Sequence, residues 1–462
     1  MQIVVFEKLI ALFEQSFQQL AVPISSLTLE RLAVMVYRAM AAQTRKFHTL
    51  DHVFALADPT DPIQSLAALF HDLVYYQVDL GFSVGLQELI MPYIEQKNGE
   101  IFVAYQPNEK SRGFIFALQI FGLRPGDHLS LTNGLNEFLS ALVMVKKLEE
   151  IVRENDLLKL IVCLEATIPF RGKNAQNESH FDLLETRLHS VNRTFALTMS
   201  QAEIEQTLTT AVTFANKDVA NFAEADVAKF LDHTWKLLPE ANVALRSPEL
   251  YSISEYRQAL QRMEVFLGAL NPDCIFHQYR NAPTEHELQP LIAFANYNIS
   301  TAREYLHMKL LATAVLEALA EVSGGDAPLS LFMGERSQQG EPVRKLEDYL
   351  PPAQSPDFAD ESTIFMLLDR GLLSEPSFDI KNSPLSVFLY TNLGPVKIKQ
   401  LLSFSQELFN GRMKPREFLA KIDCSIVAVI ARASSLMVKT RREQLLEYSA
   451  GPAMLAYQKT CI

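Results

Sequence analysis

The chain has 462 residues, and 48% of them are hydrophobic, so it can bury a sizeable core in one large helical domain or in two to three domains. Its 54 acidic residues outnumber its 42 basic residues, which gives a net charge of -12. This balance argues against broad binding of nucleic-acid polymers or anionic membranes, so a phosphate-bearing molecule would have to meet a local positive site.

We expect neither a signal peptide nor a membrane segment in this sequence. Residues 1–20 place charges among their apolar positions, so we expect an amphipathic helix there rather than a signal peptide. The most apolar C-terminal run, 426–438, is interrupted by Arg432 and is too short to span a bilayer. Four isolated cysteines form no C-x-x-C spacing, which is typical of a reducing compartment: Cys163, Cys274, Cys424 and Cys461. We therefore expect a cytoplasmic protein without a membrane segment.

Two helices are predicted at the start of the chain. Apolar residues recur at helical spacing over 4–20 and again over 25–42, where Ser26 is the expected N-cap. A proline-containing turn further on ends at Asp61, which we expect to cap the next helix.

Four residues with metal-binding side chains fall in the stretch that follows these helices. His48 and His52 are four positions apart, which would put both imidazoles on one face of a helix, about 6 Å apart at their Cβ atoms. His71 and Asp72 are adjacent and follow an apolar run, 65–70, that predicts the buried end of a second helix. Imidazole combined with carboxylate suits Zn, Fe, Mn or Ni better than Ca. The stretch therefore predicts a metal site on two neighbouring helices.

The chain after this stretch is less regular. Residues 97–113 are polar and contain glycine and proline, which predicts a loop that reaches over the site. Helical periodicity returns at 136–145 and 157–167, and a long helix over 201–215 leads to Asp218.

The sequence around His48 and His52 reads F-H-T-L-D-H-V, and the His71-Asp72 pair follows it. This pattern resembles the HD superfamily of metal-dependent phosphohydrolases. It is similar to the Y-H-N-x-x-H-A-x-x-V of cyclic-nucleotide phosphodiesterases and to the R-x-Y-H-N-L-x-H of a small bacterial HD family. That superfamily needs one more Asp far downstream, and Asp218 in F-A-N-K-D-V-A-N-F is similar to the D-L-S-N of the phosphodiesterases. The resemblance covers roughly residues 30 to 235.

The resemblance implies a set of ligands for one or two divalent transition-metal ions, Mn, Fe, Ni or Zn: His52, His71, Asp72 and Asp218. It also implies that His48 does not bind metal but protonates the leaving oxygen as a general acid. The phosphodiesterases and the HD oxygenases place further histidines after the His-Asp pair, whereas residues 73–127 contain none. We therefore expect one firmly held ion.

Other interpretations of these residues remain open. His48 and His52 could be surface histidines of a helix, and Asp218 could cap a helix that begins near Val219. Glu165 is more simply a helix-terminal carboxylate with a minor supporting role. Four cations could meet a phosphate or could equally be solvated surface charges: Lys46, Arg171, Lys173 and Lys217.

Helical periodicity continues in three further segments: 226–238, 253–270 and 288–322. Glycine, proline and polar residues then predict a linker over 326–357, followed by a C-terminal helical region over 358–462. No strand pattern is strong anywhere. We therefore predict an all-α fold, with an HD-domain-like helical bundle over 1–325 and a C-terminal helical extension.

The predicted function is that of a metal-dependent phosphohydrolase acting on a small-molecule phosphate ester, with a nucleotide phosphomonoester or phosphodiester as candidates. One alternative is a catalytically degenerate HD domain that serves as a sensor or protein-interaction scaffold. Another is an HD-type di-iron oxygenase, which would need the further histidines. The sequence leaves the oligomeric state, the substrate and the role of residues 326–462 open.

Overall fold

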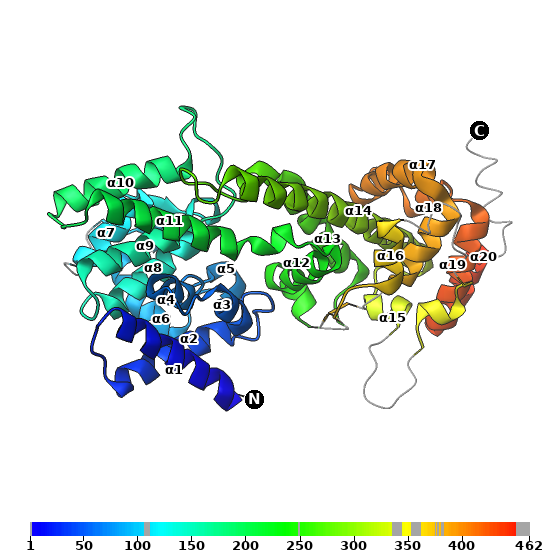
Figure 1. The fold of residues 1–462 in the computed structure, drawn as a ribbon. Helices are drawn as coiled ribbons and strands as arrows, with labels where there is room; N and C mark the ends of the chain where they lie inside the picture. Colours follow the sequence, from blue (N-terminus) through cyan, green and yellow to red (C-terminus); the bar gives the residue numbers. More distant parts are fainter. Residues whose placement is uncertain are drawn as a thin grey trace. The chain divides into compact units, whose positions relative to one another are not determined.

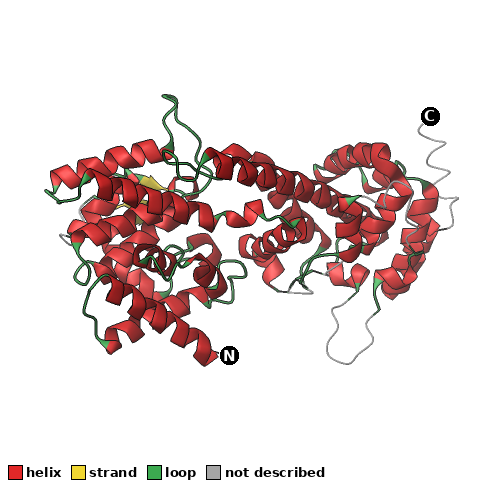
Figure 2. Ribbon diagram, viewed as in Figure 1, coloured by secondary structure: helices red, strands yellow, loops and turns green. Residues whose placement is uncertain are grey.

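The computed structural model describes most of the chain: residues 2–105, 111–247, 250–334, 344–352, 362–374, 376, 378–379 and 383–449. These residues form helices and three short strands, so the predicted all-α class is confirmed (Figure 2). None of the described helices combines the length and the apolar character needed to cross a membrane. Cys461 and part of the predicted linker lie outside the described residues.

The chain divides into two compact units. The first comprises Met1–Ala223 and Leu270–Ala295, and the second comprises Glu224–Ala269 and Asn296–Ile462. The predicted boundaries, 1–325 for the first domain and 326–357 for the linker, stay a prediction, and the range 326–357 falls within that of the second unit.

The first unit contains most of the chain's N-terminal half (Figure 1). Its helices and strands are α1 Gln2–Gln19, α2 Ser26–Met40, α3 Leu50–Leu56, α4 Pro62–Phe70, α5 Tyr76–Asp79, α6 Val84–Ile90, β1 Ile94–Lys97, β2 Glu100–Val103, α7 Arg112–Phe121, β3 His128–Leu129, α8 Leu135–Leu148, α9 Glu154–Ala166, α10 His180–Thr194 and α11 Gln201–Asp218.

Helix α9 forms the centre of this unit. Its residues from Asp156 to Ala166 are buried apart from Lys159, as expected for a helix that is apolar on nearly every face. It contacts α4, α7, α8, α10 and α11, which surround it. Helices α3, α4 and α11 also contact one another. This packing brings segments that are distant in the sequence to one place.

The helix starts follow local capping chemistry. The Asp61 side chain accepts hydrogen bonds from the amides of Ile63 and Gln64, so the predicted cap of α4 is confirmed. Helix α2 is capped by Ser25, one residue before the predicted Ser26, through the amide of Thr28.

A small antiparallel sheet, in the order β1-β2-β3, replaces part of the predicted loop at 97–113. Strands β1 and β2 pair with Ile94 opposite Val103, and both side chains are buried. Asn98 and Gly99 join the two strands with positive φ angles of 54° and 83°. The expectation of a loop from residue 97 is therefore wrong, and residues 106–110 of that segment lie outside the described part of the chain. An Asn-Gly pair between short apolar runs is the sequence signal for such a hairpin.

The second unit is also helical. Its helices are α12 Val227–Ala241, α13 Ile253–Ala269, the later part of α14 Glu285–Ser323, α15 Leu329–Met333, α16 Thr363–Arg370, α17 Pro384–Phe409, α18 Pro415–Leu419, α19 Cys424–Met437 and α20 Arg442–Ser449. Helix α17 is kinked at Gly394, whose φ is 71°. The core of this unit contains an ion pair between Lys309 Nζ and Asp379 Oδ2, 3.0 Å apart.

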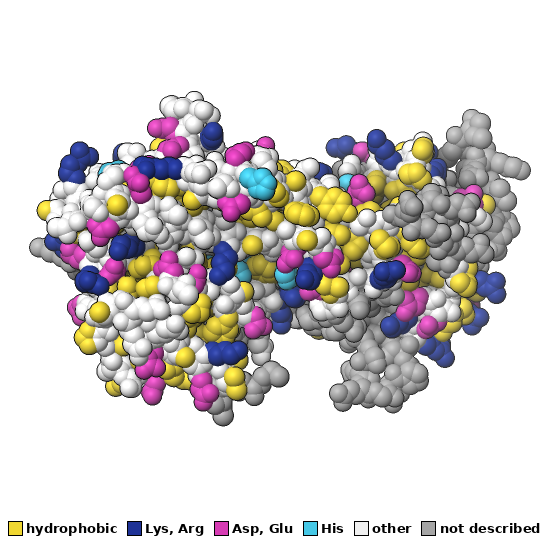
Figure 3. Space-filling model, viewed as in Figure 1, with side chains coloured by type: hydrophobic (Ala, Val, Ile, Leu, Met, Phe, Trp, Pro, Cys, Tyr) yellow, Lys and Arg dark blue, Asp and Glu magenta, His cyan; other side chains and the backbone are white. Residues whose placement is uncertain are grey.

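Charges of both signs are interspersed over the face drawn in Figure 3, and neither sign forms a continuous field there.

Candidate metal centre

His52 reaches the candidate site from α3, which begins one residue after Thr49. Thr49 has extended backbone angles, φ -112° and ψ 177°, so His48 lies before the helix. The prediction that His48 and His52 share one helical face is therefore wrong. Their rings are nevertheless neighbours, with centroids 5.9 Å apart, because the chain bends back at this point.

His71 is the C-cap residue of α4 and is buried. Its Nδ1 lies 2.9 Å from the carbonyl oxygen of Ala68, to which it can donate only if that nitrogen carries a proton. This hydrogen bond leaves Nε2 of the neutral ring as the free lone pair. Histidines that bind metals are commonly fixed in this way, since the bond sets both the tautomer and the orientation of the ring.

The backbone after His71 is held by Arg45, whose side chain is fully buried. Arg45 donates to the carbonyl oxygens of Asp72 and Leu73, at 2.6 Å and 3.3 Å. Its Nε and a terminal nitrogen also bind the two carboxylate oxygens of Asp79, at 3.0 Å and 2.6 Å. This bidentate ion pair fixes the position of the guanidinium group. The guanidinium group thereby holds the backbone turn that carries Asp72.

Helix α8 holds the same turn from another direction. The Ser140 hydroxyl accepts a hydrogen bond from the amide of Val74, and the Asn136 side-chain oxygen accepts one from the amide of Tyr76. Because Asn136 and Ser140 are four positions apart, both side chains project from one face of α8. The backbone of the turn is thus held at Asp72 and at three positions after it.

Asp218 is the last residue of α11, and Val219 is the C-cap. The alternative in which Asp218 caps a helix beginning near Val219 is therefore wrong. The end of α11 is tied to the end of α3 because Lys217 Nζ donates to the carbonyl oxygens of Leu56 and Ala57, at 2.8 Å and 3.1 Å. Asn216 exchanges two hydrogen bonds with the backbone of His277, both at 2.8 Å.

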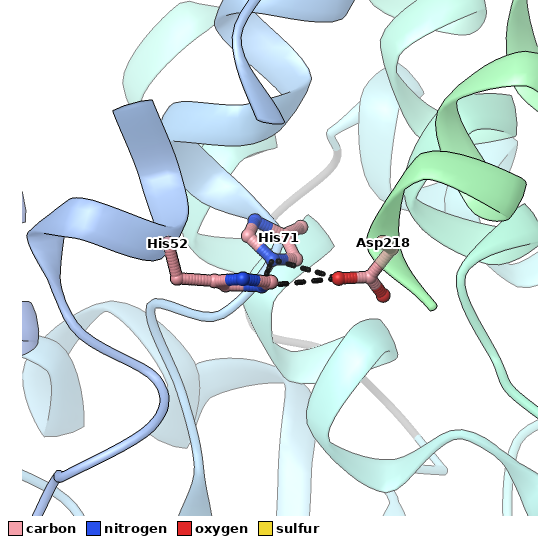
Figure 4. Close-up of side chains that lie close together, drawn as sticks. All are labelled: His52, His71 and Asp218. Carbon is pink, nitrogen blue, oxygen red and sulfur yellow. Dashed lines mark hydrogen bonds and ion pairs between the residues drawn. The ribbon is translucent and has the colours of Figure 1, made fainter. Parts of the chain in front are cut away.

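The four residues predicted as ligands lie together. His52, His71 and Asp218 form a group whose ligand atoms all lie within 4.8 Å of one another (Figure 4). His52 Nε2 lies 3.3 Å from His71 Nε2, 3.1 Å from Asp218 Oδ1 and 3.7 Å from Asp72 Oδ2. His71 Nε2 lies 3.6 Å from Asp218 Oδ1 and 3.0 Å from Asp72 Oδ2. Asp72 therefore lies beside the group of three, next to both imidazoles.

These spacings suit a transition-metal ion. Imidazole nitrogen and carboxylate oxygen bind such ions at roughly 2.0–2.2 Å, so neighbouring ligand atoms lie roughly 3.0–3.5 Å apart in tetrahedral or octahedral geometry. The side chains of His52, Asp72 and Asp218 are between 11% and 19% exposed, which leaves access from solvent. Two imidazoles with two carboxylates also match the donor preferences of Mn, Fe, Ni and Zn.

The charges in the site perturb several pKa values. Burial lowers the pKa of His71, but the carboxylates of Asp72 and Asp218 outweigh it and raise that pKa to about 9. Burial raises the pKa of the Asp72 carboxyl, but the three nearby histidines outweigh it and hold that pKa far below its usual range. The negative site thus attracts positive charge, whether a proton or a metal ion.

Glu137, on α8, is a neighbour of the site that the sequence analysis missed. Burial raises the pKa of its carboxyl to about 7, and the negative charges of Asp72 and Asp218 act in the same direction, whereas Arg171 opposes them. Nothing in the sequence near Glu137 marks it, because only the packing of α8 brings it close. Arg45 was also missed, although it stands three positions before His48.

The remaining candidates have varied surroundings. His48 lies edge-on to Tyr75, with ring centroids 4.4 Å apart. The buried Glu165 carboxylate pairs with Arg171 at 2.8 Å, with His180 at 3.0 Å and with Arg187 at 3.2 Å. Arg171 and Lys217 therefore both have protein partners, and the other two predicted cations are exposed: Lys46 and Lys173.

Comparisons of this chain with protein-family models, with curated proteins and with solved structures found no match.

Proposed function

We propose that this chain is a metal-dependent phosphohydrolase of the HD type that acts on a small-molecule phosphate ester. The observation that supports the proposal most strongly is the spacing of 3.0–3.7 Å among nitrogen and oxygen atoms of His52, His71, Asp72 and Asp218. His71 and Asp72 are neighbours in the chain, but His52 and Asp218 come from α3 and the end of α11, so no local feature of the chain explains why these three segments meet.

The four side chains would hold a divalent ion of Mn, Fe, Ni or Zn. Such an ion, when bound, lowers the pKa of a coordinated water and offsets negative charge on a phosphoryl oxygen. His71 can bind a metal ion only as a neutral ring. Its hydrogen bond from Nδ1 to the Ala68 carbonyl leaves Nε2 available as the metal ligand. Arg45 keeps the backbone of Asp72 in place, so the carboxylate has little freedom to turn away.

His48 is the residue we assign to proton transfer. Its ring lies beside that of His52 but does not join the group of close ligand atoms. A histidine at such a position can donate a proton to the oxygen that leaves phosphorus, because its pKa ordinarily lies near neutrality. The ring contact with Tyr75 would restrict its orientation.

Turnover with defined metals would test the proposal. The purified chain is treated with chelator, loaded with Mn, Fe, Ni or Zn, and assayed with p-nitrophenyl phosphate, bis-p-nitrophenyl phosphate and nucleoside monophosphates. We expect metal-dependent hydrolysis of at least one ester, and loss of both hydrolysis and metal binding in His52→Ala. His189→Ala, which changes a half-exposed histidine on α10, is the matched control.

Other outcomes separate the alternatives. Metal binding without hydrolysis of any ester would favour a sensor or scaffold. Absence of metal binding in a folded chain would contradict the proposal. An oxygenase centre with two ions is not favoured, since no further histidine joins the group among the described residues.

A further inference from the structure

A second candidate site lies in the first unit, in a groove of about 580 Å³ between α2, α6 and α8. Its floor is apolar and contains four side chains: Leu32, Met35, Leu86 and Leu89. Its volume is within the range of small-molecule sites, roughly 300–1,000 Å³. Met35 adds a flexible, polarizable side chain that can adapt to an apolar ligand.

Three cations surround this floor. Arg31 and Arg38 are seven positions apart on α2, so they lie on one face of the helix, about 10 Å apart along its axis. Lys147 contributes the third charge from α8. Within the described part of the chain, none of the three forms a hydrogen bond or an ion pair.

The positive charge of this groove contrasts with the net negative charge of the whole chain. No Asp or Glu is among the described residues that line it, although the whole chain has a net charge of -12. An unscreened cluster of like charges next to an apolar floor favours a ligand with complementary charge and an apolar body. A cationic ligand would be repelled, and a neutral one would leave the cations without partners.

We propose that this groove binds a single-chain anionic amphiphile, either a fatty-acid-like carboxylate or an alkyl phosphate. The alkyl chain lies on the floor of leucine and methionine side chains, and the acidic head group pairs with the arginines of α2 and with Lys147. This site uses none of the residues assigned to metal binding or proton transfer. The inference is therefore independent of the proposed phosphohydrolase activity.

Gly85 provides a direct way to block the groove. It lines the groove on α6, and a Cβ atom added at this position would meet no atom within 4 Å. Its backbone is helical rather than left-handed, so a larger residue causes no strain, and replacing glycine in a helix is usually favourable. Gly85→Phe should therefore fold normally while occupying the space of an alkyl chain.

Calorimetric titration and thermal unfolding of the full chain would test this proposal, with four decyl compounds kept below their micelle-forming concentrations. Decanoate and decyl phosphate are the ligands, and decanol and decyltrimethylammonium are the controls for the head group. We expect one molecule of either anion to bind per chain and to raise the melting temperature. The two anions together show whether the head group must be a carboxylate or a phosphate.

The variants make the expectation specific. Arg31→Met combined with Arg38→Met should weaken decanoate binding about five- to thirtyfold, because two partly solvated ion pairs are lost while the apolar stems remain. Gly85→Phe should abolish binding. Lys146→Met removes a neighbouring charge on α8 that does not line the groove, and should change the affinity less than about twofold.

Three results would overturn the proposal. The first is no binding of either anion by the intact chain. The second is equal binding of decanol or decyltrimethylammonium, which would show that the cations do not select the ligand. The third is unchanged binding of the anions in Gly85→Phe. This variant keeps all three cations, so unchanged binding would show that the anions bind outside the groove.

Discussion

His52 Nε2 and Asp218 Oδ1 lie 3.1 Å apart although 166 positions separate these residues in the sequence. One residue belongs to α3 and the other ends α11, and Lys217 ties the ends of these two helices together. The pair also lies beside a second imidazole, that of His71. A hydrogen bond between one histidine and one aspartate would need no second imidazole, whereas a metal ion would use all three.

Asp218→Asn should leave the fold intact but remove the stabilisation by metal. Because a bound ion stabilises only the state that binds it, the parent chain should melt at a higher temperature with metal than with chelator. In Asp218→Asn this difference should disappear, while the melting temperature in chelator stays near that of the parent. Thermal unfolding with and without metal is the measurement.

Asp61→Ala is the matched control for that experiment. It removes the N-cap of α4, which should cost about 1 kcal/mol of stability but leave the metal-dependent shift unchanged. An unchanged shift in Asp218→Asn would contradict the proposed ligand set.

His48→Ala should separate proton transfer from metal binding. We expect the variant to bind metal as the parent does, and to lose roughly 100-fold or more in turnover of an ester with a poor leaving group. It should lose less with a p-nitrophenyl ester, whose leaving group needs little protonation. Steady-state kinetics with both esters and a metal titration are the measurements, and loss of metal would instead identify His48 as a ligand.

Arg45→Met should destabilise the chain and weaken metal binding together. Breaking the ion pair leaves the half-buried Asp79 without its partner, which costs up to roughly 3 kcal/mol, the lower end of the range for a buried pair. Loss of the bonds to the Asp72 and Leu73 carbonyls should also weaken metal affinity about 10- to 100-fold. Denaturant unfolding and metal titration are the measurements.

Two further variants serve as controls for Arg45→Met. Lys97→Met breaks the solvent-exposed pair with Glu95 and should leave the free energy of unfolding nearly unchanged. Arg45→Lys keeps the charge but cannot form both bonds to Asp79, so it should recover stability only in part. Full recovery of metal affinity in Arg45→Lys would show that the geometry of the guanidinium group is unimportant.

Glu137→Gln should change how stability depends on pH in the presence of chelator. Because the pKa of Glu137 is about 7 in the fold and near 4.5 when unfolded, the folded state binds more protons between these values. The free energy of unfolding should therefore fall as pH rises from 4.5 to 7, by on the order of 3 kcal/mol. Glu137→Gln should remove this fall, as measured by denaturant unfolding across the range, and an identical profile in parent and variant would contradict the assignment.

Metal binding should release a proton near neutral pH. The pKa of His71 is raised to about 9, so in metal-free protein this group contributes stability below pH 6.5 that is lost as pH rises through 9. A metal must displace that proton, and its affinity should therefore rise up to about tenfold per pH unit below pH 9. Calorimetry in buffers of different ionisation enthalpy should detect about one released proton per ion, and no buffer dependence would show that His71 is already neutral.

The sequence determined the local features of this protein because they depend on residues a few positions apart. Apolar spacing predicted several of the helices, among them α1, α2, α9 and α11, but it did not predict α7 or α10. The continuous apolar run of α9 accounts for its central position, and the carboxylate of Asp61 caps α4 through its own neighbouring amides. The hairpin turn at Asn98 and Gly99 was also present in the sequence, since both residues tolerate positive φ. It was missed because strands of four residues give only a short alternating pattern.

Only the tertiary structure decided which of these residues meet. His48 does not lie on the predicted helical face because the backbone at Thr49 is extended. Its ring nevertheless lies next to the ring of His52. Arg45 binds the backbone carbonyl of Asp72, which is 27 positions away in the sequence. The packing of α8 brings Glu137 close enough for the charges of Asp72 and Asp218 to raise the pKa of its carboxyl. These contacts depend on the way in which the many buried side chains of different helices pack against one another. The spacing of residues along the chain does not specify that packing.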